Sequence, residues 1–150
     1  MTSDALYQEA LLRLARAAKG AGRLDAPDAT AARDNALCGD DVQVDVSVRD
    51  GRIAAVGHRV RGCVLCQASA SVIGSVAPGR APAEIARARA ALAAMLREGG
   101  SVPGAPWEEL AVFLPVRDVP SRHECALLPF DTLSDALARS PGTSPGTSED

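Results

Sequence analysis

An alternating apolar pattern in residues 42–48 constrains the fold of this chain more than any other feature. Four valines there alternate with polar residues, which predicts a strand with one buried and one solvent-facing side. Asp50-Gly51 then supplies a two-residue hairpin turn, and residues 52–60 return as a second strand. A stable sheet needs a third strand, and the segment before Cys38 is the one available to supply it. The sequence therefore predicts a small antiparallel sheet.

Helices are predicted on both sides of this hairpin. Apolar spacing and Gly or Pro end signals indicate helices over residues 4–19, 63–76, 83–98 and 121–138. We expect Pro129 to kink or interrupt the last of these, because proline removes a helical hydrogen bond. Small residues at 68–71 would let another backbone approach the second helix closely. Residues 23–36 show no clear period and are expected to form a loop or short turn, and residues 101–118, with three prolines, a short helical turn.

Composition bounds the class of protein. A chain of 150 residues with 47% hydrophobic and 23% charged residues fits one globular domain, which we assign to residues 1–139. Residues 140–150 repeat Ser-Pro-Gly-Thr without an apolar anchor and are expected to be a disordered tail. The net charge of −3 argues against a nucleic-acid partner, and no apolar run is long enough to span a membrane. The first residues lack an apolar signal core, so we expect a cytoplasmic protein.

The four cysteines indicate metal or thiol chemistry, which is commoner than disulfides in a cytoplasmic protein. Cys38 and Asp40 flank Gly39, which lets the backbone turn so that a thiol and a carboxylate converge. Cys63 begins a predicted helix, whose positive end favours a thiolate, and Cys125 also lies near a helix start. Thiolates bind zinc and iron tightly, and a carboxylate can complete a four-coordinate site. One shared metal site explains these positions.

Other interpretations of the same residues stay open at this point. A single cysteine is often a small buried hydrophobic residue, and Asp40 is also explained as a turn or cap residue. Cys63 and Cys66 form a CxxC redox motif, but there is no second CxxC and the preceding chain is a hairpin rather than a βαβ unit. His58 and His123 are expected at the surface or behind the ligands, not as ligands themselves.

A set of motifs resembles a known family. The motifs are Asp34-Asn35-Ala36-Leu37-Cys38-Gly39-Asp40, Gly62-Cys63 followed by Ala68-Ser69-Ala70-Ser71, and Arg122-x-x-Cys125-Ala126-x-Leu128 followed by Thr132-Leu133. Together they resemble the scaffold family of NifU N-terminal, IscU and SufU proteins, from about Leu6 to Leu137. The long interval between Cys63 and Cys125, filled by residues 101–118, resembles the SufU branch.

The resemblance implies an α+β fold, with about three antiparallel strands packed against helices and a metal site at one end. The family's ligands map onto Cys38, Asp40, Cys63 and Cys125. In SufU-like proteins this set holds zinc and receives sulfur from a SufS-like cysteine desulfurase, whereas in IscU-like proteins it assembles a [2Fe–2S] cluster. The implied function is iron–sulfur cluster assembly, with the product passed to a downstream apo-protein or cluster carrier. Similarity to SufU makes Cys38 the persulfide acceptor, and similarity to IscU favours Cys125.

The sequence also departs from the family pattern. Glu124 stands where SufU-like proteins have Lys and IscU-like proteins have His, so a carboxylate here would bind metal or weaken docking of the desulfurase. Arg122 matches a basic position of the SufU branch. Cys66 falls where the family has no ligand and would act as a spare thiol, a persulfide relay or an oxidation hazard. Two alternatives remain, a zinc-dependent sulfurtransferase that carries no cluster and a binding module with purely structural zinc.

Overall fold

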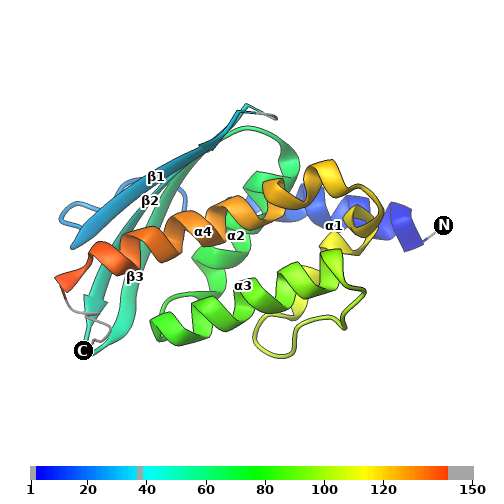
Figure 1. Ribbon diagram of the computed structural model, residues 1–150. Coiled ribbons are helices and arrows are strands. Elements are labelled where there is room, and N and C mark those ends of the chain that lie inside the picture. The colour runs from blue at the N-terminus through cyan, green and yellow to red at the C-terminus, as the bar shows by residue number, and fades with distance from the viewer. Residues whose placement is uncertain (1–2, 37–38, 142–150) are drawn as a thin grey trace.

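The computed structural model describes residues 3–36 and 39–141, and it shows a three-stranded sheet covered on one face by helices (Figure 1). The sheet order is β1-β2-β3 with antiparallel pairing throughout. Helix α4 contacts β1 and β2, and α2 contacts β3, while α1 and α3 form the outer part of the helical layer. The α+β prediction is confirmed. The elements are α1 Ser3–Ala17, β1 Ala29–Asn35, β2 Asp40–Arg49, β3 Arg52–Arg61, α2 Val64–Val76, α3 Pro82–Arg97, the 3₁₀ helices η1 Glu108–Asp118 and η2 Pro120–Arg122, and α4 His123–Arg139.

The predicted hairpin forms from β2 and β3. Asp50 and Gly51 both have positive φ, at 54° and 75°, which is the backbone that a tight two-residue hairpin turn requires. Val42, Val44 and Val46 of β2 are almost completely buried and Val48 is half-buried, so their side of the sheet is the one that faces α4 and α2. Local alternation and turn chemistry thus determine this part of the fold.

The third strand, β1, comes from the segment before Cys38, as the sheet requires. The expectation of a loop or short turn over residues 23–36 was wrong for residues 29–35, which pair with β2 in the register Ala31↔Val44 and Arg33↔Val42. On the side of the β2 valines this strand carries two alanines, Ala29 and Ala31, of which Ala31 is buried, followed by Arg33 and Asn35. Alanine has a low strand propensity, so pairing with an existing hairpin decides the conformation and the sequence alone gives little sign of it.

Small side chains let α2 pack tightly against two neighbours, as predicted for residues 68–71. The Ser69 hydroxyl donates to the Ala126 carbonyl of α4 at 2.6 Å, and the Lys19 backbone N–H donates to the Ser71 hydroxyl at 3.0 Å. A Cβ atom at Gly74 would lie 1.9 Å from the Lys19 carbonyl oxygen. The backbones therefore approach too closely for larger residues.

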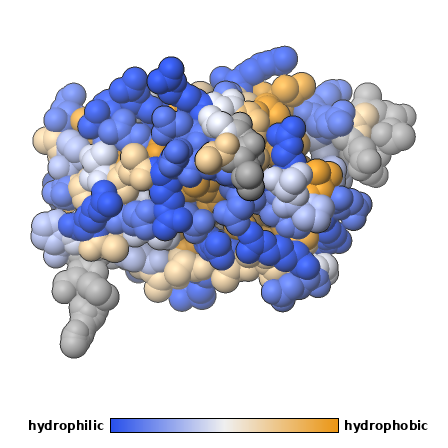
Figure 2. Space-filling model, turned by 45° about the horizontal axis from the view of Figure 1, so that its top comes forward, coloured by the Kyte–Doolittle hydropathy of each residue, from blue (hydrophilic) through white to orange (hydrophobic). Residues whose placement is uncertain are grey.

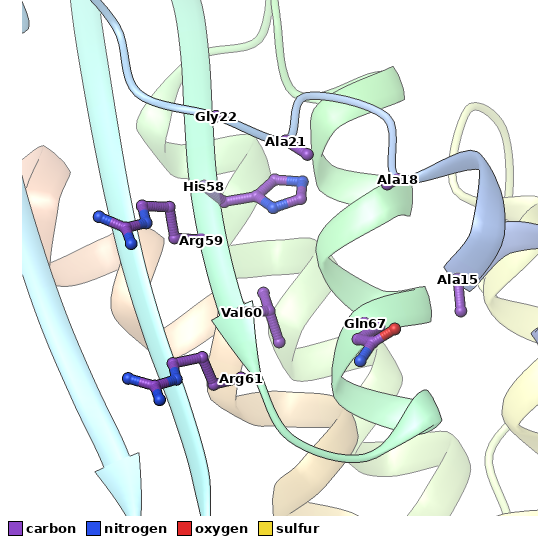
Figure 3. Close-up of a pocket in the computed structure, with 9 residues that line it drawn as sticks. All are labelled: Ala15, Ala18, Ala21, Gly22, His58, Arg59, Val60, Arg61 and Gln67. Carbon is purple, nitrogen blue, oxygen red and sulfur yellow. The ribbon is translucent and has the colours of Figure 1, made fainter.

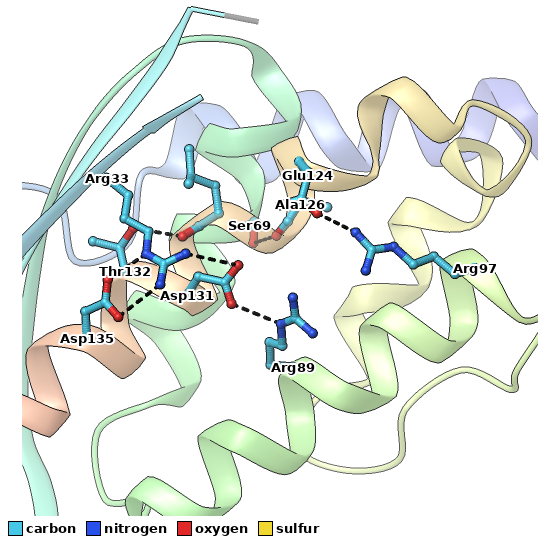
Figure 4. Close-up of polar contacts among 10 residues, drawn as sticks. Arg33, Ser69, Arg89, Arg97, Glu124, Ala126, Asp131, Thr132 and Asp135 are labelled. Atoms are coloured by element: carbon cyan, nitrogen blue, oxygen red, sulfur yellow. Dashed lines mark hydrogen bonds and ion pairs between the residues drawn. The ribbon is translucent and has the colours of Figure 1, made fainter. Parts of the chain in front are cut away.

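Helix α4 runs the length of the sheet without the interruption expected at Pro129. Pro129 is itself buried, and the helix continues through it on an apolar face that includes Leu127, Phe130 and Leu133. Ion pairs add to this packing: Arg33 of β1 contacts Asp135 at 2.6 Å, and Arg89 of α3 contacts Asp131 at 3.0 Å (Figure 4). Tertiary packing outweighs the lost hydrogen bond.

The segment expected to hold only a short helical turn is more extensively structured. Its 3₁₀ helix η1 has 11 residues and buries Leu110 and Phe113 completely. Trp107 packs on Phe130 of α4 with ring centroids 5.7 Å apart, and the Arg117 guanidinium donates to the Met95 carbonyl at 2.8 Å. The segment that lengthens the interval between Cys63 and Cys125 therefore contributes side chains to the hydrophobic core.

The molecular surface is mainly hydrophilic on the face shown in Figure 2, with apolar side chains in small patches. The large apolar side chains exposed among the described residues are Leu6, Leu12, Val102 and Val119. None of the described helices is long and apolar enough to cross a membrane. The predicted tail falls mostly on residues 142–150, which lie outside the described residues, so its disorder stays a prediction.

Candidate metal centre

Three of the predicted ligands meet at one end of the sheet. Asp40, Cys63 and Cys125 each offer one donor atom, and these atoms all lie within 4.8 Å of one another. The donors come from three separate elements: the first residue of β2, the residue before α2, and the first turn of α4. One carboxylate oxygen and two sulfurs at this separation are a donor set that suits zinc or iron.

The carboxylate of Asp40 is completely buried and directly contacts Cys63. The Cys63 backbone N–H donates to Asp40 Oδ1 at 2.8 Å, and the Cys63 thiol donates to Asp40 Oδ2 at 3.4 Å. Among the described residues no Lys, Arg or His forms an ion pair with Asp40. A buried carboxylate without a counter-charge is costly. A metal cation held with the two sulfurs would supply that charge, so the residues present fit a metal.

Gly62 makes the contact between Asp40 and Cys63 sterically feasible. A Cβ atom at this position would lie 2.2 Å from Asp40 Oδ1 and 2.9 Å from Asp40 Cα. Only glycine lets the connection from β3 to α2 pass over the carboxylate. The sequence indicated a strand break at Gly62, but not that the space of its missing side chain is filled by Asp40.

Both described thiols of the centre lie at helix N-termini. Cys63 is the N-cap residue of α2 and its side chain makes no capping hydrogen bond, while Cys125 is the third residue of α4. The N-terminal end of a helix carries a partial positive charge and stabilises anions nearby. Two helix N-termini therefore meet at this centre, and Cys63 lies at the start of a helix, as predicted.

The fourth predicted ligand, Cys38, lies outside the described residues, so its part in the centre stays a prediction. The residue that follows it, Gly39, has φ of +73°, and its N–H donates to the Asn35 carbonyl at 2.8 Å. The predicted backbone turn at Gly39 therefore closes the connection between β1 and Asp40.

Glu124 and Arg122 are both exposed beside the first turn of α4. The Glu124 carboxylate forms an ion pair with the Arg97 guanidinium of α3 (Figure 4) and does not belong to the three-donor cluster. Arg122, directly before α4, has no ion pair among the described residues. Glu124 is thus engaged with a neighbouring helix, a contact that the sequence did not indicate, and Arg122 is available to a partner.

The two histidines are buried rather than at the surface, where one interpretation placed them. The His58 Nε2 atom lies 2.6 Å from the Lys19 carbonyl oxygen, and His123 Nε2 lies 3.1 Å from the Val116 carbonyl oxygen. Burial lowers the pKa of His58, although the bond to the Lys19 carbonyl opposes that shift. Both rings hold backbone segments in place, and neither belongs to the described donor cluster.

A cavity of about 470 Å³ lies between β3, the first turns of α2 and the end of α1 (Figure 3). His58, Val60 and Gln67 project into the space between β3 and α2, while the side chains of Arg59 and Arg61 extend across the sheet. The Gln67 side-chain amide donates to the Gly62 carbonyl at 3.0 Å. This bond connects the cavity wall to the turn that carries Cys63.

A small antiparallel sheet on a helical layer, with an aspartate and two cysteines clustered at one end, defines an α+β protein with a candidate metal site. The family model described as NifU-like N terminal domain matches residues 6–99, more than half of the chain. The chain therefore belongs to the NifU-like N-terminal domain family. That matched range contains Asp40 and Cys63, two of the clustered donors.

Individual relatives agree with this assignment. The chain is 30% identical over 141 residues to the iron–sulfur cluster assembly scaffold protein IscU of Thermotoga maritima, covering 93% of this chain and 97% of that one. The N-terminal NifU-like protein of Brucella abortus has a similar crystal structure, with a TM-score of 0.86, 36% identity, and coverage of 91% and 94%. A putative scaffold protein for the SUF system from Fervidobacterium islandicum shares the fold, with a TM-score of 0.79, 24% identity, and coverage of 90% and 98%.

Proposed function

We propose that this protein is an iron–sulfur cluster assembly scaffold that works at the cluster of Asp40, Cys63 and Cys125, with Cys38 as the fourth ligand. The observation that carries the proposal is the convergence of these three donors within 4.8 Å in a chain of this family. The name of the Thermotoga maritima relative supports the same function. The cytoplasm, where thiols stay reduced, is the compartment that suits it.

The chemistry follows from the donor types. Sulfur ligands hold zinc or iron firmly, whereas a carboxylate is a harder and weaker ligand for these metals. Asp40 is therefore the exchangeable ligand, and its hydrogen bond from the Cys63 N–H orients it while it is released. A bound cation would neutralise the negative charge that the buried carboxylate and the thiolates bring together.

The sulfur enters as a persulfide from a SufS-like cysteine desulfurase and leaves as part of a cluster or as transferred sulfur. Cys38 is the proposed first acceptor and Cys125 the alternative. The long packed segment before α4 supports placing this protein nearer the SufU branch, for which a zinc-bound form is expected. The likeness to IscU leads us to expect a [2Fe–2S] cluster as the cargo. The recipient is a downstream apo-protein or a cluster carrier.

The test is the metal and acid-labile sulfide content of the full chain purified without oxygen, before and after supply of iron, cysteine and a desulfurase. We expect one bound metal or one cluster per chain, and loss of binding in Cys63→Ser and Cys125→Ser. Asp41→Ala is the matched control, because Asp41 is exposed and adjacent to Asp40. Wild-type protein that holds neither metal nor sulfide under all these conditions would contradict the proposal.

A further inference from the structure

Another cysteine lies about one helical turn after Cys63 but does not belong to the candidate metal centre. Cys66 on α2 is completely buried, follows Cys63 by three residues, and lies outside the group of Asp40, Cys63 and Cys125. Cys63, in contrast, is partly exposed, and both residues are thiols in the structure. The four-ligand site gives no reason for a cysteine at this position.

The two cysteines occupy the N-cap and the third helical position at the start of α2. Cys63 is the N-cap residue, with extended backbone at φ −73° and ψ 166°, and Val64 is the first helical residue. Cys66 is therefore at the third helical position. Side chains of a helix slant toward its N-terminus, and the third position is the one whose side chain reaches back to the N-cap in a capping box. This is also the position of the two cysteines in helix-start CxxC motifs that form disulfides.

We propose that Cys66 is a resolving thiol, which releases sulfide from a persulfide carried on Cys63. The proposal rests on the proposed function, because it assumes that sulfur reaches the centre as a persulfide and that the outer sulfur passes from the first acceptor to the Cys63 thiol, which returns the acceptor to its thiol form. The Cys66 sulfur attacks Cys63 Sγ and forms a Cys63–Cys66 disulfide. The bond between Cys63 Sγ and the outer sulfur breaks, and the outer sulfur keeps the electron pair and takes the Cys66 thiol proton to leave as hydrosulfide.

Burial explains the order of these events. A sulfur donor reaches the partly exposed Cys63 but not the buried Cys66, so of these two thiols only Cys63 receives the outer sulfur. The attack then comes from a thiol three residues further along the same helix, so it needs no encounter with a second molecule. Hydrosulfide is set free beside Asp40 and Cys125, where metal ligands are gathered. A dithiol reductant must reduce the disulfide before the next cycle.

The disulfide also changes the metal centre. While Cys63 is bonded to Cys66 its sulfur is no longer a thiolate ligand, so the centre is left with Asp40 and Cys125 among its described donors. Sulfide release and the loss of one ligand are thus the same event, and the centre regains its full donor set only after reduction.

The experiment treats the full chain with inorganic polysulfide in the absence of oxygen and reductant, removes the small molecules, and maps Cys63 by mass spectrometry after alkylation. In wild-type protein we expect a Cys63–Cys66 disulfide with release of hydrosulfide. In Cys66→Ala we expect Cys63 to retain the added sulfur and hydrosulfide release to slow by about tenfold or more. Cys66→Val, closer in size to the buried side chain, is the second variant, and circular dichroism and melting show that both fold.

An untreated anaerobic sample controls for adventitious oxidation and must show no disulfide. The proposal is overturned if treated wild-type protein keeps a persulfide on Cys63 and contains no Cys63–Cys66 bond, a result that needs no variant. Equal hydrosulfide release from wild type and from folded Cys66→Ala would overturn it too.

These outcomes are separable from those of the proposed function. Protein that holds no metal or cluster but still forms the disulfide and hydrosulfide would end the scaffold proposal and keep the resolving thiol. Protein that holds a cluster but keeps its persulfide on Cys63 would support the scaffold proposal and end the proposal of a resolving thiol.

Discussion

At the scale of single residues, Asp40 is completely buried and carries a carboxylate, which is a weaker ligand for zinc and iron than a thiolate. It makes two hydrogen bonds to Cys63 and has no ion pair among the described residues. We expect Asp40→Ala to lengthen the lifetime of the bound metal or cluster, because the exchangeable ligand is removed and sulfur ligands remain. Metal loss under chelator challenge measures this, with Asp41→Ala as the control. Faster loss from Asp40→Ala than from the control would exclude an exchange role for this carboxylate.

Gly62 gives a second prediction at this scale. We expect Gly62→Ala to weaken metal binding by about tenfold or more and to destabilise the fold by about 1–3 kcal/mol, because its Cβ atom would displace Asp40. Metal titration and denaturant unfolding measure the two effects. Gly104→Ala is the matched control, since a Cβ atom at Gly104 meets nothing within 4 Å. Equal behaviour of the two variants would show that the close contact has no functional role.

At the scale of elements, the buried Asp45 carboxylate on β2 holds together the segments that bring β1 into the sheet. It accepts hydrogen bonds from the Arg23 guanidinium at 2.7 Å, the Leu24 N–H at 3.0 Å and the Thr30 hydroxyl at 2.7 Å. Burial raises the pKa of Asp45, but these bonds outweigh it and hold the pKa below its ordinary value. The ionised carboxylate thus favours the folded state.

A pH-dependent loss of stability follows. Because the pKa is lower in the folded protein, this contribution is fully present at neutral pH and is lost as the pH falls below about 4. We expect Asp45→Asn to cost about 2 kcal/mol at pH 7 and progressively less at lower pH. Urea unfolding at several pH values measures the difference. A constant cost across the acidic range would mean that the charge of Asp45 is unimportant.

At the scale of the whole molecule, what could be predicted depends on how local the signal is. The hairpin, α1, α2 and α3 follow from alternation, apolar spacing and glycine or proline end signals within each segment. β1 and the full extent of η1 depend on packing against distant segments. Their own amino-acid composition therefore gives little indication of these structures. The buried positions of His58 and His123 are tertiary effects of the same kind.

The candidate site divides in the same way. The donor types of Asp40, Cys63 and Cys125, and their places at element junctions, are local features, so the sequence was enough to predict these residues as ligands, and the structure brings their donor atoms together. The contact of Gly62 with Asp40 and the ion pair between Arg97 and Glu124 join residues far apart in the chain, so no local pattern could reveal them.

The last prediction concerns the charge at the end of the molecule where Asp40, Cys63 and Cys125 lie. Arg122 is exposed directly before α4 and Cys125, on a protein whose net charge is −3. If a desulfurase docks at this end, Arg122→Glu should slow association by about tenfold at low salt, and the effect should shrink as salt screens the charges. Arg49→Glu makes the same charge change at the opposite end of β2 from Asp40. Association rates with a desulfurase over a salt series distinguish the two variants. Equal slowing in both would indicate a general charge effect, and no slowing in either would place the docking surface elsewhere.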